Sequence, residues 1–264
     1  AFVPAFKPFK EKLRLETEAD GTVNQLNCPK LLISADNHFL LKGDVSLQDL
    51  SHPQDAYIFG NLSNLYADPD GIAFFVRNLS KDYKGVPPAL QHLGTISFRG
   101  EISGYFTDLV TYGEVRTDIG TVKTDVKFSS DKEKGYFSYS GAVKTAEFEL
   151  GKLLANDKFG KVTFNMDVKG SHYAKRYPSV TMKGLVASID YSDYTYENIT
   201  LDGEYKQGGF NGNVSFDDEN GAIQLNGSIN TAGKTPTFNF RAAIDHFRPN
   251  TLHLTPKYKD TELA

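Results

Sequence analysis

The chain has 264 residues, of which 39% are hydrophobic, and its 29 basic and 33 acidic residues give a formal net charge of -4. These charges are spread along the chain and form no basic stripe, so we expect no nucleic-acid partner. Cys28 is the single cysteine, which excludes an internal disulfide and a zinc site built from several thiolates. No stretch reaches the roughly 18 consecutive apolar residues of a membrane-spanning helix.

Residues 1–92 are expected to form an N-terminal β-rich module. A short helix is predicted near 71–79, because Ile72, Phe75, Val76 and Leu79 recur at the spacing of one helix face. Pro87 and Pro88 then predict a module boundary, since neither residue donates a backbone hydrogen bond. The expected strands of this module are 31–35, 38–47 and 57–62.

Residues 93–254 are expected to form a β-meander. Apolar side chains alternate with polar ones, as in the run from Val162 to Lys169, and Gly, Asn or Asp residues close each run, as at 217–221. A short helix is predicted near 149–155, and residues 255–264 are expected to be a disordered tail. The pattern predicts an all-β fold with minor helix: an elongated antiparallel meander, folded over on itself into a groove or taco-like sheet with an apolar interior.

Glycine recurs in the middle of the predicted strands, on their apolar face. A glycine inside a strand has no side chain to pack and costs stability, so its recurrence calls for a reason. One explanation is curvature alone, because bent sheets use glycine kinks. The other is that the bend leaves an apolar groove open for a ligand. The candidate groove-shaping glycines are Gly100, Gly104, Gly203, Gly212 and Gly227.

The apolar face supplies a candidate lipid-binding groove, because acyl chains need a continuous apolar strip that is shielded from water. For any single residue, an ordinary core position is an equally good explanation. The candidate lining residues are Phe98, Ile102, Phe106, Phe164, Met166, Ile199, Leu201, Phe210, Val214, Leu225, Ile229, Phe238 and Phe240.

Motifs for catalysis and metal binding are missing from the sequence. The six histidines have no ligand spacing, and no nucleophile elbow or phosphate-binding glycine loop occurs. The run Asp68-Pro69-Asp70-Gly71 resembles the opening of a calcium loop, but Leu79 stands where a bidentate glutamate is required, so a turn that starts the following helix explains it better. We therefore expect a non-enzymatic protein without catalytic residues, metal or cofactor.

A second hypothesis is a secreted or surface β-sandwich that binds a glycan or a protein. Its contact residues would be aromatic side chains in loops, and the absence of tryptophan argues against a sugar-stacking platform. The candidate contact residues are Tyr173, Tyr177, Tyr191 and Tyr194.

Several stretches resemble the repeats of the TamB and AsmA-like envelope proteins. The resemblance covers roughly residues 94 to 254 and consists of β-repeat patterns rather than a catalytic signature. The stretches that carry it are 104–113, 116–120, 124–126, 148–154, 159–162, 194–203, 210–212 and 252–254.

The resemblance implies a segment of a cell-envelope lipid-transport or outer-membrane assembly protein in the periplasm of a Gram-negative bacterium. It implies a phospholipid or another lipid as ligand, an outer-membrane assembly barrel as a possible partner, and an inner-membrane anchor outside this fragment. The start at Ala1 rather than at a methionine agrees with a piece of a longer protein.

Overall fold

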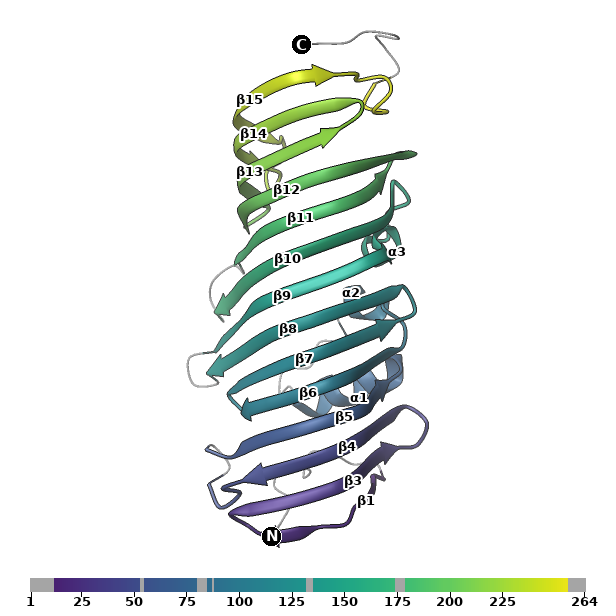
Figure 1. Cartoon of the computed structure of the whole chain (residues 1–264), viewed down its shortest axis with the longest axis vertical. Coiled ribbons are helices and arrows are strands. Elements are labelled where there is room, and N and C mark those ends of the chain that lie inside the picture. The colour runs from purple at the N-terminus through teal and green to yellow at the C-terminus, as the bar shows by residue number, and fades with distance from the viewer. Residues whose placement is uncertain are drawn as a thin grey trace. The chain divides into compact units, whose positions relative to one another are not determined.

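The structure is a computed structural model that describes residues 12–52, 55–79, 85–86, 88–131, 135–173 and 179–255. Fifteen strands of the described residues form an open antiparallel sheet, in which almost every strand pairs with its neighbours in the chain (Figure 1). The one departure is β2, which pairs with β3 beside β1. The prediction of an all-β meander with little helix is confirmed.

The strands are β1 (Arg14–Glu16), β2 (Asp20–Thr22), β3 (Gln25–Ala35), β4 (Phe39–Gln48), β5 (Tyr57–Ala67), β6 (Ile96–Tyr105), β7 (Asp108–Thr117), β8 (Gly120–Asp131), β9 (Tyr136–Glu149), β10 (Phe159–Tyr173), β11 (Ser179–Tyr191), β12 (Tyr194–Lys206), β13 (Gly209–Asp218), β14 (Gly221–Asn230) and β15 (Thr237–Phe247). The helices are α1 (Pro69–Leu79), α2 (Pro88–Gln91) and α3 (Leu150–Leu154).

Short turns join most of these strands, as the polar and glycine-rich breaks in the sequence predict. Ser192 and Asp193 connect β11 to β12 with φ of 50° and 64°, while Tyr191 and Tyr194 pair across the hairpin. Positive φ at both central residues gives a turn whose twist matches that of the flanking strands. The predicted turn at 217–221 is the β13–β14 hairpin, with Glu219 and Asn220 at its tip.

The chain divides into two compact units, residues 1–123 and residues 124–264, called unit 1 and unit 2 below. The sequence analysis placed the boundary near residue 92 instead. Strands β6 and β7 follow residue 92, but β6 pairs with β5 along most of its length and β7 pairs with β6, so both strands fall in unit 1. Residue 87 lies outside the described residues, and Pro88 begins the short helix α2, where a missing N–H costs nothing.

Helix α1 packs on one face of the sheet in unit 1, and Figure 1 shows it behind β5 and β6. Phe74 of this helix is buried with Ala35 and Phe39, at the ends of β3 and β4. Asp68 caps the helix, because its Oδ1 accepts a hydrogen bond of 2.8 Å from the Gly71 N–H. The run that opened like a calcium loop is thus a helix start, and the helix predicted near 71–79 is α1.

A second cluster in unit 1 consists of side chains from β4, β5 and β6. Val45, Leu62 and Phe98 are buried, with Ile102 and Val115 among the partly buried residues around them. Leu62 is 1% exposed. This cluster shows that unit 1 buries the apolar face of its strands as a hydrophobic core.

Unit 2 has fewer buried apolar side chains among its described residues. Those are Val126, Phe148 and Val162 on β8, β9 and β10, and Pro249 and Leu252 in the segment after β15. Helix α3, in the position of the helix predicted near 149–155, contributes no buried residue. Of the predicted tail, residues 256–264 lie outside the described residues.

Candidate functional site

The apolar face of unit 2 is built from rows of side chains that lie opposite one another on successive strands. Residues directly opposite in an antiparallel pair point to the same face, so each row is continuous across the sheet. One row joins β9 to β15 and consists mainly of aliphatic side chains. Its members are Val143, Met166, Gly184, Leu201, Val214, Leu225 and Ala242.

The neighbouring row, two residues along each strand, carries most of the glycines. It consists of Gly141, Val168, Met182, Gly203, Gly212, Gly227 and Phe240. The next row is again made of large side chains, with Tyr139, Gly170, Val180, Tyr205, Phe210, Ile229 and Phe238. The glycines therefore form a band between two rows of bulky residues.

Close packing explains why this band is glycine. A Cβ atom at Gly212 would lie 2.4 Å from the Asp202 carbonyl oxygen and 2.5 Å from the Gly203 Cα. A Cβ at Gly203 would lie 2.4 Å from the ring of Phe210, which covers that glycine. The space above these two glycines is therefore filled by neighbouring atoms, and of the two explanations left open by the sequence this geometry favours bending and close packing.

Backbone shape adds to this requirement at Gly227. Its φ of 146° lies in a region that residues with a side chain rarely adopt, and a Cβ would approach the Asn239 carbonyl oxygen to 2.2 Å. Gly100 and Gly104 of β6, in unit 1, also have positive φ, at 154° and 127°. Their role in shaping a ligand groove stays a prediction.

The candidate lining residues of unit 2 differ in how much solvent they meet. Phe164, Met166, Ile199, Leu201, Phe210, Val214, Leu225 and Ile229 are all half-buried. On the last strand, β15, Phe238 is 61% exposed and Phe240 is 47% exposed. Unit 2 thus presents an apolar surface that the described residues cover only in part.

The three candidates in unit 1 have a different setting. Phe98 is buried in the core cluster of unit 1, and Ile102 packs against that cluster. Phe106 lies in the turn between β6 and β7 and is 51% exposed, so it does not belong to a strand face. The sequence analysis extended the alternation of β6 one residue too far, since the strand ends at Tyr105 and the turn begins at Phe106.

The chain after β15 closes one end of the apolar face of unit 2. Tyr196 donates a hydrogen bond of 2.6 Å to the Leu252 carbonyl, and the Leu252 side chain is fully buried. The rings of Tyr194 and Tyr196 form an edge-to-face contact with their centroids 4.8 Å apart, and Tyr194 also contacts the ring of His253. Burial raises the pKa of Tyr196 to about 12, so this hydroxyl stays a donor at physiological pH. The sequence analysis missed this closure, because no local pattern links residues 56 positions apart.

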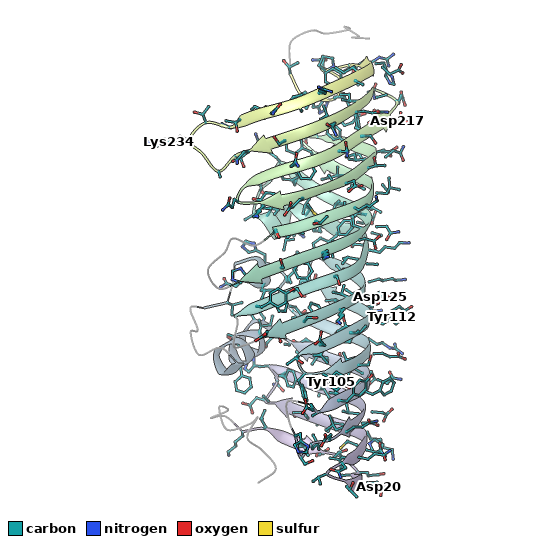
Figure 2. All side chains as sticks on the ribbon, turned by 90° about the vertical axis from the view of Figure 1, so that its left-hand side faces the viewer. Asp20, Tyr105, Tyr112, Asp125, Asp217 and Lys234 are labelled. Carbon is teal, nitrogen blue, oxygen red and sulfur yellow. The ribbon has the colours of Figure 1, made fainter. Side chains whose placement is uncertain are left out.

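The opposite face of unit 2 is polar. One of its rows reads Asp167, Lys183, Asp202, Asn213, Asn226 and Arg241 from β10 to β15. Within it Lys183 and Asp202 form an ion pair of 2.8 Å, which raises the pKa of Lys183. Figure 2 shows Asp217 of β13 projecting outward from the sheet on this side. From β10 to β15 this polar row therefore lies on the face opposite the apolar rows.

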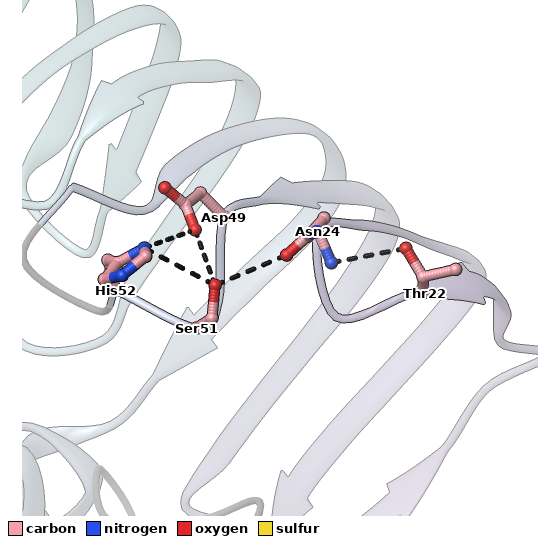
Figure 3. A network of polar contacts seen from close by, with 5 residues as sticks. All are labelled: Thr22, Asn24, Asp49, Ser51 and His52. Atoms are coloured by element: carbon pink, nitrogen blue, oxygen red, sulfur yellow. Dashed lines mark hydrogen bonds and ion pairs between the residues drawn. The ribbon is translucent and has the colours of Figure 1, made fainter.

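A serine, a histidine and an aspartate meet in the turn after β4 (Figure 3). His52 Nδ1 lies 2.9 Å from Asp49 Oδ1 and 3.5 Å from Ser51 Oγ, while Ser51 also bonds to Asp49 and Asn24. In a hydrolytic triad, one ring nitrogen of the histidine faces the carboxylate and the other ring nitrogen faces the nucleophile. Here Nδ1 makes both contacts, so the geometry is that of a hydrogen-bonded turn.

His38, Asp68 and Asp70 are close enough for one metal ion, with ligand atoms within 4.8 Å of one another. Two of these residues already have partners. His38 Nδ1 lies 2.7 Å from Asp68 Oδ2, and Asp68 also caps α1. The hydrogen bond to Asp68 raises the pKa of His38. Burial alone would raise the pKa of Asp68, but the bonds from Gly71 and His38 outweigh it and lower that pKa. The arrangement joins the β3–β4 turn to the helix start.

Of the four tyrosines of the second hypothesis, Tyr191 and Tyr194 have described side chains, and both are half-buried. Tyr191 and Tyr194 flank the β11–β12 turn, and Tyr194 is half-buried by its contacts with Tyr196 and His253. Burial raises the pKa of Tyr194. Tyr177 lies outside the described residues, as does the side chain of Tyr173.

Comparisons with known proteins give no match: no family model, no curated protein and no solved structure is significantly similar to the chain. The resemblance to TamB and AsmA-like proteins therefore stays a prediction from the residues. Among the described helices, none has the length and apolar character needed to cross a membrane.

Proposed function

We propose that this protein is non-enzymatic and that unit 2 binds the acyl chains of a phospholipid on its apolar face. The observation that carries the proposal is the set of half-buried apolar rows from β10 to β14, which continue to the exposed rings of Phe238 and Phe240. Contiguous exposed apolar surface on a water-soluble domain marks a place of interaction.

The chemistry of a phospholipid fits two faces of opposite polarity. The free energy falls when acyl chains leave water and contact the aliphatic row that contains Leu201 and Leu225, while the headgroup stays in solvent. Phe210, folded over Gly203, adds an aromatic surface beside that row. The polar face, with its ion pair between Lys183 and Asp202, is suited to water.

The cellular context follows the family resemblance and is proposed with it. The chain would be a periplasmic segment of a cell-envelope lipid-transport or outer-membrane assembly protein, with its membrane anchor elsewhere. The β-sandwich alternative loses support, because the described strands form an open sheet in chain order rather than two packed sheets.

A pair of matched leucine variants tests the proposal. Leu225 lies on the apolar face, whereas Leu185 lies on the polar face, opposite Thr200 and Asn165, and is 41% exposed. With a phosphatidylethanolamine that carries a photoreactive acyl chain, we expect Leu225→Gln to lower crosslinking several-fold and Leu185→Gln to leave it unchanged. Far-ultraviolet dichroism checks that both variants keep the fold.

Two outcomes would contradict the proposal. One is crosslinking of the parent protein no greater than that of an unrelated soluble β-sandwich. The other is an equal effect of the two leucine variants at equal stability, which would place the lipid on neither face in particular. Mass spectrometry of lipids that copurify with the protein from native membranes would then identify the ligand of a positive result.

A further inference from the structure

Strand β15 is the exposed edge of the sheet formed by the described residues. Every residue from Thr237 to Asp245 is solvent-exposed, and β14 is the one strand that pairs with β15 among the described residues. The outer side of such a strand carries unpaired backbone N–H and C=O groups, which are a template for another strand. Its ten paired positions along β14 make it long enough to hold a partner in register.

The first strands of the sheet do not offer a comparable edge. β1 and β2 have three residues each and pair with opposite ends of β3, at Leu32–Ser34 and at Gln25–Asn27. Short, interrupted edge strands are a common way of preventing further pairing. A head-to-tail filament would need both edges, so the contrast favours a closed pair of identical edges.

The charges of β15 identify the strand that fits this edge. Arg241 ends the polar row in which Asp167, Lys183 and Asp202 alternate in sign, and its neighbour on β14 is the neutral Asn226. Asp245 is 90% exposed and falls at a register shift, between the partners of Ala222 and Ile223, so it faces no residue of β14. The printed partner of Asp245 is its chain neighbour His246, whose Nδ1 lies 3.4 Å from Asp245 Oδ2, and the carboxylate stays accessible to a strand that adds to the outer side.

We propose that β15 pairs antiparallel with β15 of a second copy of this chain, around a two-fold axis at Ala243. In such a pair, a residue two positions before the axis lies opposite the residue two positions after it. Arg241 of each copy then faces Asp245 of the other, which makes two opposite-charge pairs. A two-fold axis at Arg241 would place two guanidinium groups opposite each other.

The face pattern restricts the register in the same way. Opposite residues of an antiparallel pair share a face, so an axis at a residue keeps the apolar faces of both copies on one side. Ala242 then lies opposite Ile244 on the apolar face. The inference does not depend on the lipid proposal, since it uses the edge and the charges of β15 alone.

Charge exchange tests this pairing. Arg241→Glu and Asp245→Arg each place like charges opposite one another in the dimer, whereas the double variant restores opposite charges in reversed order. By sedimentation equilibrium at low salt, we expect each single variant to weaken dimerisation at least tenfold and the double variant to recover most of it. Lys234→Glu, in the exposed β14–β15 connection, and Asp217→Arg, on β13, make the same charge changes away from the edge and are expected to leave the dimer intact.

Two adjacent alanines supply a second test that does not use charge. The N–H groups of neighbouring strand residues point to opposite sides, so Ala242 and Ala243 direct one amide to β14 and one outward. Of Ala242→Pro and Ala243→Pro, we expect one to destabilise unit 2 and the other to keep the fold and lose the dimer. A monomeric parent protein at all concentrations, single charge variants that dimerise normally, a double variant that stays monomeric, or a folded proline variant that still dimerises would each overturn the proposal.

Discussion

Units 1 and 2 are both built from strands with alternating apolar and polar side chains, but their apolar faces are buried to different extents. In unit 1 the apolar face packs into clusters around Phe74 and Phe98, and helix α1 contributes to the cover. In the described part of unit 2 the corresponding rows stay half-buried, and Leu252 closes one end. The comparison teaches that alternation defines which face is apolar, whereas a covering segment decides whether that face becomes a core or stays an accessible surface.

The largest difference is expected from truncating a phenylalanine in each unit. Phe98→Ala removes a buried ring and should cost about 3–5 kcal/mol of unfolding free energy. Phe210→Ala removes a half-buried ring and should cost less, about 1–2 kcal/mol. Urea unfolding measures the free energy, and hydrogen exchange assigns the loss to one unit. Equal costs would mean that the two faces are equally closed and would remove the basis of the comparison.

A medium effect is expected at the glycine band of unit 2. Gly212→Ala places a Cβ against the backbone of β12 and should cost about 1–3 kcal/mol, because the strands must separate. Gly233→Ala is the matched control, since its nearest neighbour would be 3.5 Å away, and should change stability by less than about 0.5 kcal/mol. Thermal unfolding compares the two. An unchanged Gly212→Ala protein with reduced lipid crosslinking would instead support glycines that hold a groove open.

The smallest effect is expected from pH in unit 1. In the folded protein, the hydrogen bond to Asp68 raises the pKa of His38 above its ordinary value of 6.5. The protonated histidine therefore stabilises the fold fully below pH 6.5, and this stabilisation is lost as the pH rises through the pKa of the folded state. The pKa of Asp68 is lowered, so its contribution is present above its ordinary value of 3.8 and is lost as the pH falls through the folded pKa.

His38→Gln isolates the histidine part of that dependence. Above pH 6.5 the parent protein should lose stability with rising pH more steeply than the variant, in denaturant titrations followed at α1. His172→Gln is the control, because His172 is an exposed histidine at the end of β10 in unit 2. Parallel pH profiles for all three proteins would show that the link between the β3–β4 turn and α1 does not depend on the charge of His38.

The candidate site shows how far sequence reasoning extends. The alternation around Leu201, Val214 and Leu225 was enough to place these residues on one face, since side chains of a strand alternate with a period of two. It was not enough to separate Phe98, which is core, from Leu225, which is half-buried, because both have the same local pattern. The glycines were located correctly within strands, but the ring of Phe210 over Gly203 depends on the pairing of β12 with β13.

The sequence by itself determined the class of fold, most strands, and the start of α1, because these features depend on residues that are close together in the sequence. Tertiary structure decided where the two units divide, which rows of the apolar face are covered, and that Leu252 closes one end of unit 2. The physical reason is that burial depends on which distant segment comes to lie on a face. Tyr196 and Leu252 meet across 56 positions, and no periodicity of the chain encodes that meeting.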